Sequence, residues 1–169
     1  DEIENWLTHA VARDGELQLQ PLDLAPIIEE LQHTYPSAKI EDKLTLKPLG
    51  DAVLIRQVVV NLVSNAVKYA PKGESPDIVV ATAADLEPSM VRIEVRDQGT
   101  PLPPSEWVRI FEPYSRGAGA GLQASGTGMG LATCKRIVER HGGQISVTPN
   151  RDSAGVPIGN TFVFTLPVA

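Results

Sequence analysis

The chain has 169 residues, of which 42% are hydrophobic, and this is enough for one domain with its own core. Its formal net charge of -6 and its pI of about 5.0 argue against nucleic acid or an anionic membrane surface as a partner. The single cysteine, Cys134, excludes an internal disulfide and fits a reducing compartment. No apolar run approaches the roughly 20 residues that a membrane helix needs. We therefore expect a domain that works in a reducing compartment without direct contact to a membrane.

The first residues, 1–13, carry apolar side chains at helical spacing, and the sequence does not begin with methionine. This pattern predicts the tail of a long amphipathic helix whose partner lies outside the sequence. A short helix folded back on its own domain is the alternative.

Strand and helix patterns then interleave along the chain. Strands are expected at residues 17–20, 39–46, 78–83, 90–96, 144–148 and 161–166, and helices at 24–35, from 50–51 to about 70, at 105–111 and at 131–141. Asp23 is expected to cap the first of these helices, and residues 115–125 are expected to form a mobile flap. This interleaving predicts an α/β or α+β sandwich.

A polar face interrupts the apolar pattern of the helix at residues 57–69. At about 100° per residue, the side chains of this face fall within roughly 80° of one another; they are Gln57, Asn61, Asn65 and Lys68. Amides in a buried helix cost free energy unless a partner satisfies them. The pattern therefore predicts a ligand with charged oxygens or a hydrated metal ion.

The stretch GTGMG at residues 126–130 precedes a helix and indicates phosphate binding, because glycines allow close approach to helix N-terminal N–H groups. It is neither a Walker loop nor a Rossmann turn. A flexible turn with a helix cap is the alternative.

Asp97 ends a predicted strand and is followed by Gly99. A carboxylate in this position can accept a hydrogen bond from the exocyclic amine of a purine. An ordinary turn aspartate is the alternative.

Together, these motifs resemble the catalytic ATP-binding domain of two-component sensor histidine kinases, which belong to the Bergerat-fold ATPase superfamily. The motifs occur in order: N-x-x-x-N-A-x-K-Y at 61–69, D-x-G at 97–99, F-E-P-Y at 111–114, and G-x-G-x-G-L at 126–131. The resemblance covers about residues 17–167. It implies a two-layer α+β sandwich whose mixed, mainly antiparallel sheet is covered on one face by about three helices. It also implies that residues 1–16 are the end of a dimerisation helix and a linker, and that residues 17–169 are the catalytic domain, with an ATP lid at about 115–125.

The resemblance implies roles for four residues of the polar helix. Asn65 would ligate Mg²⁺, and Asn61 would support the metal and the phosphates. Lys68 would pair with phosphate oxygens, and Tyr69 would stack on adenine.

Further roles follow for the rest of the site. Asp97, next to Gly99, would accept the adenine amine, with help from the hydroxyl of Thr161 or a water. Phe111 and Tyr114 would anchor the lid, and Arg116 could reach the phosphates when the lid closes. Gly126, Gly128 and Gly130 would bring the lid and the start of the last helix to the phosphates. Thr127, Met129 and Leu131 belong to the same nucleotide-binding stretch.

Two positions bear on the reaction. Hydrolases and serine kinases of the superfamily carry a glutamate where this chain has Asn61, and an amide cannot act as a general base. Asn61 therefore favours transfer to histidine, whose neutral ring is already nucleophilic. Pro101 replaces the second glycine of the family's D-x-G-x-G pattern; we expect it to be tolerated, with a regulatory pseudokinase as the alternative.

We expect the domain to bind Mg·ATP and to donate the γ-phosphoryl group to a histidine on a dimerisation domain of the same protein, for onward transfer to a response regulator. None of His9, His33 and His141 matches the family's acceptor pattern, so each is interpreted as structural. The chain alone is not expected to phosphorylate itself. An ATP hydrolase or serine kinase of the same fold is the remaining alternative.

Overall fold

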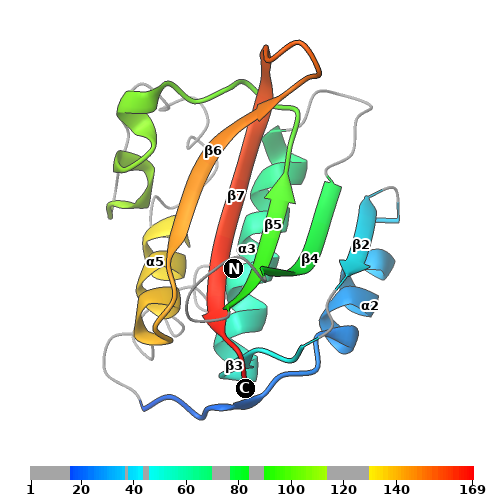
Figure 1. Cartoon of the computed structure of the whole chain (residues 1–169), viewed down its shortest axis with the longest axis vertical. Coiled ribbons are helices and arrows are strands. Elements are labelled where there is room, and N and C mark those ends of the chain that lie inside the picture. The colour runs from blue at the N-terminus through cyan, green and yellow to red at the C-terminus, as the bar shows by residue number, and fades with distance from the viewer. Residues whose placement is uncertain (1–15, 37, 44–45, 70–76, 84–89, 114–129) are drawn as a thin grey trace.

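The computed structural model describes residues 16–36, 38–43, 46–69, 77–83, 90–113 and 130–169 (Figure 1). The elements in order are β1 (Gln20–Pro21), α2 (Ala25–Thr34), β2 (Lys39–Lys43), β3 (Leu49–Gly50), α3 (Ala52–Tyr69), β4 (Asp77–Ala83), β5 (Met90–Arg96), the 3₁₀ turns η1 (Pro104–Glu106) and η2 (Arg109–Phe111), α5 (Gly130–Arg140), β6 (Ile145–Arg151) and β7 (Pro157–Pro167). The predicted helix at 1–13 and the predicted flap at 115–125 lie outside the described residues.

The main sheet has the strand order β2-β4-β5-β7-β6. β2 runs parallel to β4, and every other neighbouring pair is antiparallel. The predicted mixed, mainly antiparallel sheet is therefore confirmed. β5 lies in the middle of the sheet, so both of its edges are hydrogen-bonded.

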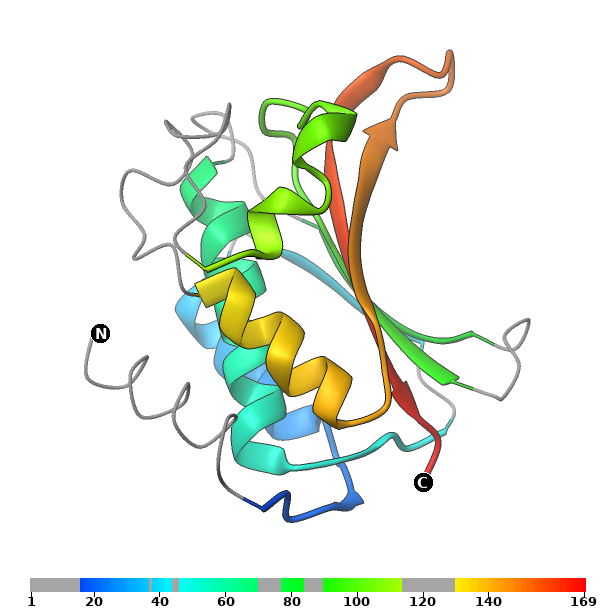
Figure 2. The same cartoon turned by 90° about the vertical axis from the view of Figure 1, so that its left-hand side faces the viewer.

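The helices α2, α3 and α5 lie on one face of this sheet (Figure 2). Alternation along the strands supplies the sheet's half of the core, since Val91, Ile93 and Val95 of β5 are buried while the residues between them are half-exposed. The helices and β7 supply the remainder, including Val58, Leu62, Ile137, Val138, Phe162 and Phe164. Each fully buried side chain of this kind contributes about 1.5–3 kcal/mol, which makes this layer interface the main source of stability.

Asp51 caps α3. Its Oδ1 accepts from the backbone N–H groups of Val53 and Leu54 at 3.1 and 3.2 Å, and its Oδ2 accepts from the N–H of Gln18 at 3.0 Å. The predicted start of this helix at 50–51 is thus confirmed, and the cap also fixes the chain that leads into β1.

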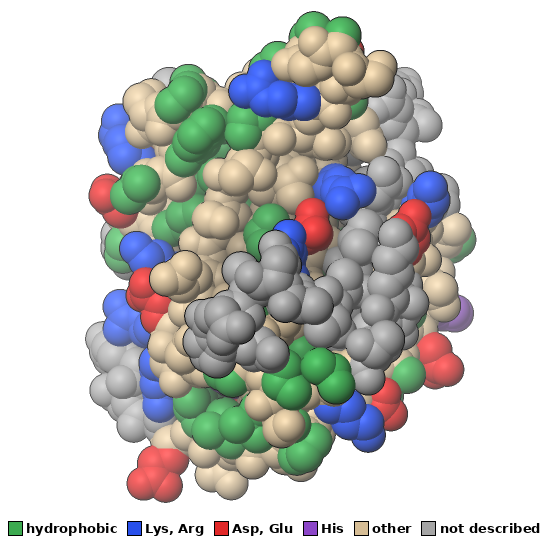
Figure 3. All heavy atoms as spheres, in the orientation of Figure 1, with side chains coloured by type: hydrophobic (Ala, Val, Ile, Leu, Met, Phe, Trp, Pro, Cys, Tyr) green, Lys and Arg blue, Asp and Glu red, His purple; other side chains and the backbone are tan. Residues whose placement is uncertain are grey.

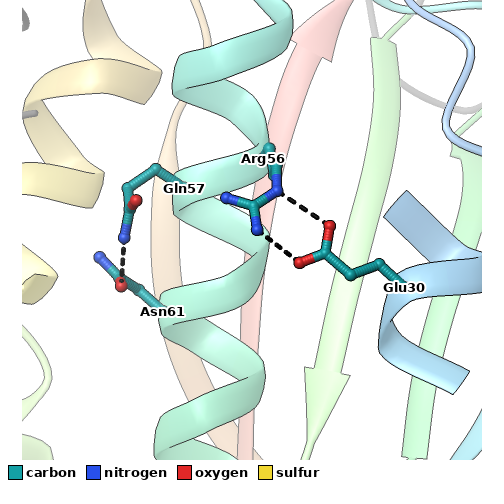
Figure 4. A network of polar contacts seen from close by, with 4 residues as sticks. All are labelled: Glu30, Arg56, Gln57 and Asn61. Atoms are coloured by element: carbon teal, nitrogen blue, oxygen red, sulfur yellow. Dashed lines mark hydrogen bonds and ion pairs between the residues drawn. The ribbon is translucent and has the colours of Figure 1, made fainter. Parts of the chain in front are cut away.

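An exposed ion pair joins α2 to α3. The guanidinium of Arg56 contacts both carboxylate oxygens of Glu30, with Nε at 2.9 Å from Oε1 (Figure 4). The Arg56 hydrogen bond lowers the pKa of the Glu30 carboxyl. Because the pair is open to solvent, it contributes under about 1 kcal/mol, and the buried leucines hold α2 in place.

Several predicted boundaries were wrong. The first strand is Gln20–Pro21 and includes the proline, which an edge strand tolerates. The helix expected at 105–111 is two separate 3₁₀ turns, because so short a segment cannot offset the nucleation cost of an α-helix. β2 ends earlier than expected, and the final two strands are longer. Asp23 accepts the N–H of Ala25 at 3.1 Å, but the residue at the N-cap is Leu24.

On the face drawn in Figure 3, acidic and basic side chains are interspersed. Across the described part of the chain, none of the helices is both long and apolar enough to cross a bilayer.

Candidate functional site

The predicted site residues come from elements that end at one side of the molecule. The C-terminal ends of α3 and β5 and the N-terminal end of α5 lie toward the same end of the sandwich (Figures 1 and 2). The motif at 61–69, the motif at 97–99 and the described residues 130–131 belong to these ends.

The polar face of α3 is partly satisfied by the chain itself. The Oδ1 of Asn61 accepts from Nε2 of Gln57 at 2.8 Å (Figure 4), and its Nδ2 lies 3.7 Å from Sγ of Cys134 on α5. The side chain of Asn65, half-buried one turn further on, makes no hydrogen bond to any described residue. The expectation of amides that need a ligand therefore applies to Asn65 more than to Asn61.

The start of α5 lies against this face of α3. Gly130, its first residue, is so placed that an added Cβ would be 3.9 Å from Nδ2 of Asn61. The first N–H groups of a helix have no partner within the helix and carry the positive end of its dipole, so they suit an anion. Leu131 packs against the core and anchors this first turn.

Cys134 lies one turn further along α5 and is fully buried. Burial raises the pKa of its thiol to about 12, so the thiol stays protonated and is no nucleophile. The thiol of Cys134 also contacts the amide of Asn61.

Asp97 directly follows β5 and is only 3% exposed. Its Oδ1 accepts from the N–H of Gly99 at 2.9 Å, the N–H of Asn160 at 3.2 Å and Nδ2 of Asn160 at 3.4 Å. Burial raises the pKa of the Asp97 carboxyl, and these hydrogen bonds oppose the shift. Within the described residues every hydrogen bond to this carboxylate reaches Oδ1, which leaves Oδ2 as the acceptor that a ligand can use.

The sequence interpretation missed Asn160. This buried residue of β7 also receives the N–H of Leu102 on its Oδ1 at 2.9 Å and donates from Nδ2 to the carbonyl of Thr100 at 3.0 Å. Thr161, expected to assist Asp97, pairs with Arg96 across the sheet, and strand alternation places it on the other face from Phe162. Only the register between β5 and β7 determines which of Asn160 and Thr161 faces Asp97, and this register cannot be read from a single sequence.

Gly159 was also missed. A Cβ at this position would lie 1.9 Å from the carbonyl oxygen of Asp97, closer than any real contact. Only glycine lets β7 approach the end of β5 so closely.

Pro101 lies between the two loop residues that Asn160 holds. The carbonyl of Thr100 and the N–H of Leu102 both bond to the Asn160 amide, and the carbonyl of Leu102 accepts from Nε1 of Trp107 at 3.1 Å. None of these bonds needs the N–H that proline lacks.

Phe111 packs edge-to-face on Phe162, with ring centroids 6.2 Å apart and an interplanar angle of 81°. This contact attaches η2 to the sheet. Tyr114, Arg116 and residues 126–129 lie outside the described part of the chain, and so does the side chain of Tyr69, while Lys68 is exposed near the end of α3.

The donor set bears on whether Mg²⁺ and a nucleotide fit. No three His, Cys, Asp or Glu side chains in the described ranges lie close enough to hold a metal alone. An amide oxygen such as that of Asn65 suits Mg²⁺ when phosphates and water complete the shell. The residues present thus fit a magnesium ion that arrives with a nucleotide.

Comparison with known proteins identifies the class. Residues 50–169 match the family described as histidine kinase-, DNA gyrase B-, and HSP90-like ATPase. The chain belongs to this family, and its predicted resemblance to the ATP-binding domain of sensor histidine kinases is confirmed.

Among curated relatives, Two-component system protein A of Emericella nidulans is 39% identical over 131 residues, which are 75% of this chain and 18% of the relative. The adaptive-response sensory kinase SasA of Synechocystis is 32% identical over 177 residues, covering 98% of this chain and 44% of SasA. The chain thus spans less than half the length of these relatives.

Among solved structures, full-length ShkA in complex with AMPPNP superposes with a TM-score of 0.74 and 25% identity, covering 99% of this chain and 35% of ShkA. The mycobacterial sensor histidine kinase MprB superposes with a TM-score of 0.69 and 27% identity, covering 88% of this chain and 97% of that structure. Histidine kinase ThkA, in its complex with response regulator TrrA, superposes with a TM-score of 0.68 and 25% identity, covering 99% of this chain and 48% of that chain.

Proposed function

We propose that this domain binds Mg·ATP and donates the γ-phosphoryl group to a histidine on a dimerisation domain of the same protein, from which a response regulator receives it. The observation that carries the proposal is the buried carboxylate of Asp97, which is held through Oδ1 and whose Oδ2 receives no hydrogen bond from the residues that the structure describes. AMPPNP in the ShkA structure and a response regulator in the ThkA structure support the same assignment.

In this proposal the adenine amine donates to Oδ2 of Asp97, and Tyr69 stacks on the base. Asn65 holds the metal through its amide oxygen, and Lys68 contacts the phosphates. Bound Mg²⁺ would neutralise phosphate charge during transfer. The N–H groups at the start of α5 would hold the phosphate chain beside the lid.

Asn61 supports transfer rather than hydrolysis. Its amide is held between Gln57 and Cys134, and an amide cannot take a proton from water. A histidine acceptor needs no such base. We further propose that residues 1–16 belong to the dimerisation helix and linker, that residues 17–169 are the catalytic domain, and that the domain works in the cytoplasm.

Titration calorimetry with ATP, with and without Mg²⁺, tests the binding step. The unaltered chain should bind more tightly with Mg²⁺, and Asn65→Ala should lose that gain. Val53→Ala, a substitution of an exposed residue at the opposite end of α3, should retain it. Equal affinities for Asn65→Ala and the unaltered chain would remove the metal assignment.

Labelled ATP then tests transfer. The chain alone should acquire no label, and a matching dimerisation domain added in trans should become phosphorylated on histidine. Tight ATP binding without transfer would indicate a regulatory pseudokinase. Rapid phosphate release by the chain alone, lost in Asn61→Ala, would indicate a hydrolase.

A further inference from the structure

The orientation of the Asn160 side chain follows from its partners. The N–H of Leu102 can only donate, so the atom 2.9 Å from it is the amide oxygen of Asn160. The Nδ2 group must then be directed toward Oδ1 of Asp97 and the carbonyl of Thr100, at 3.4 and 3.0 Å, and both of these atoms are acceptors.

The backbone of Asn160 reinforces this arrangement. Its carbonyl accepts the N–H of Asp97 at 2.8 Å, and its N–H donates to Oδ1 of Asp97 at 3.2 Å. One residue of β7 therefore holds the backbone of Asp97, one oxygen of its carboxylate and both sides of Pro101. Asn160 is 6% exposed, so water does not compete strongly for these bonds.

A carboxylate without such support can rotate and offer either oxygen. Three donors on Oδ1 fix the plane of the Asp97 carboxylate, and two of the three come from Asn160. The remaining oxygen then has one direction in which to accept a hydrogen bond. A fixed acceptor discriminates between ligands more sharply than a rotating one, because a ligand without a donor leaves a buried charge unpaired.

We propose that Asn160 is a positioning residue that sets the selectivity of this site for purines bearing a 6-amino group. The proposal rests on the proposed function, since it requires a nucleotide whose base reaches Asp97. Asn160 acts through Asp97 and the loop at 97–102, and does not itself contact the base.

The test compares the dissociation constants of ATP and purine riboside triphosphate, which lacks only the 6-amine. The unaltered chain should bind ATP about tenfold or more tightly, as expected for a hydrogen bond to a charged acceptor. Asn160→Ala removes the Nδ2 contact and both bonds to the 97–102 loop but keeps the backbone N–H of residue 160 on Oδ1, so the ratio of the two constants should fall at least threefold. A purely structural role would weaken both nucleotides equally and leave their ratio unchanged, which would overturn the proposal.

Asn160→Asp keeps the shape and the acceptor for Leu102 but turns a carboxylate oxygen toward Asp97, so the ratio should fall there as well. This variant decides the question if Asn160→Ala does not fold. Asn150→Ala is the matched control, because Nδ2 of Asn150 donates to the backbone carbonyl of Asp97, at 3.3 Å, and not to its carboxylate, so the ratio should not change.

The two proposals fail in different ways. No binding of either nucleotide by the unaltered chain would refute the proposed function itself. ATP binding with an unchanged ratio in both Asn160 variants would refute only the role of Asn160. Equal binding of the two nucleotides by the unaltered chain would also refute the role of Asn160, because there would be no selectivity for that residue to set.

Discussion

The backbone N–H of Asp51 donates to Nε2 of His141 over 3.0 Å, which joins the start of α3 to the end of α5 across 90 positions of sequence. Because Nε2 accepts, the ring proton is on Nδ1, which donates to the carbonyl of Ile137 at 2.7 Å. The structural role expected for His141 is thus to join two backbone groups through its ring, and the ring connects the two helices that flank the candidate site.

His141→Ala should destabilise the domain by about 1–3 kcal/mol, because the buried N–H of Asp51 would lose its partner. Urea unfolding followed by circular dichroism measures this change. His33→Ala is the control, since His33 is exposed at the end of α2 and its removal should shift the midpoint little. Equal shifts for the two variants would show that the Asp51 bond contributes nothing.

Asp97→Asn should separate stability from binding. The folded-state pKa of Asp97 is raised above its usual value of 3.8, chiefly by burial. The folded protein therefore binds a proton at Asp97 more readily than the unfolded chain does. The contribution of Asp97 to the free energy of unfolding falls as the pH rises from the unfolded-state pKa through the folded-state pKa, and it is lowest at neutral pH. The neutral amide should make the nucleotide-free domain more resistant to urea at pH 7, while lowering ATP affinity about tenfold or more. Loss of stability at pH 7 would contradict the burial argument.

Gly159→Ala should destabilise the domain by about 1–3 kcal/mol and weaken ATP binding, because the new methyl group would overlap the carbonyl of Asp97. Thermal melting and nucleotide titration measure the two effects. Gly130→Ala at the first position of α5, where the added Cβ would only be in ordinary van der Waals contact with Nδ2 of Asn61, should leave the melting temperature unchanged or slightly raised. A normal melting temperature for Gly159→Ala would mean that the ends of β5 and β7 can separate freely.

Gln57→Leu should loosen the amide of Asn61, because it removes the donor to Oδ1. The side-chain amide resonances of Asn61 should shift or broaden in a nitrogen-15 spectrum. Affinity for Mg·ATP should fall about threefold to tenfold, which corresponds to the loss of one ordinary hydrogen bond. Gln32→Leu, on the exposed side of α2, is the control. Unchanged Asn61 resonances in Gln57→Leu would show that Cys134 alone orients the amide.

Periodic patterns predicted the layers of this fold because local sequence determines them. The alternation at 90–96 gave the bounds of β5, and the apolar pattern around Asn61 and Asn65 gave α3. Short elements depend on distant partners, so β3 and its pairing with β1 were missed.

The site shows the same difference between features that local sequence determines and features that depend on distant partners. Asp97 and Gly99 are adjacent in sequence, and their hydrogen bond was within reach of a motif argument. Asn160 and Gly159 meet Asp97 only through the register of β5 and β7, so the neighbouring Thr161 was chosen instead.

The pairing of β5 with β7 also determines when the site can form as the chain folds. Asp97 and Asn160 are 63 positions apart, whereas β6 and β7 form a hairpin of neighbouring strands. Closing the longer loop has the larger entropic cost, and such non-local contacts form slowly. A chain leaving the ribosome has no fixed Asp97 carboxylate until β7 has emerged and joined the sheet. The nucleotide selectivity that we propose for Asn160 would therefore arise in the same step that joins β7 to β5.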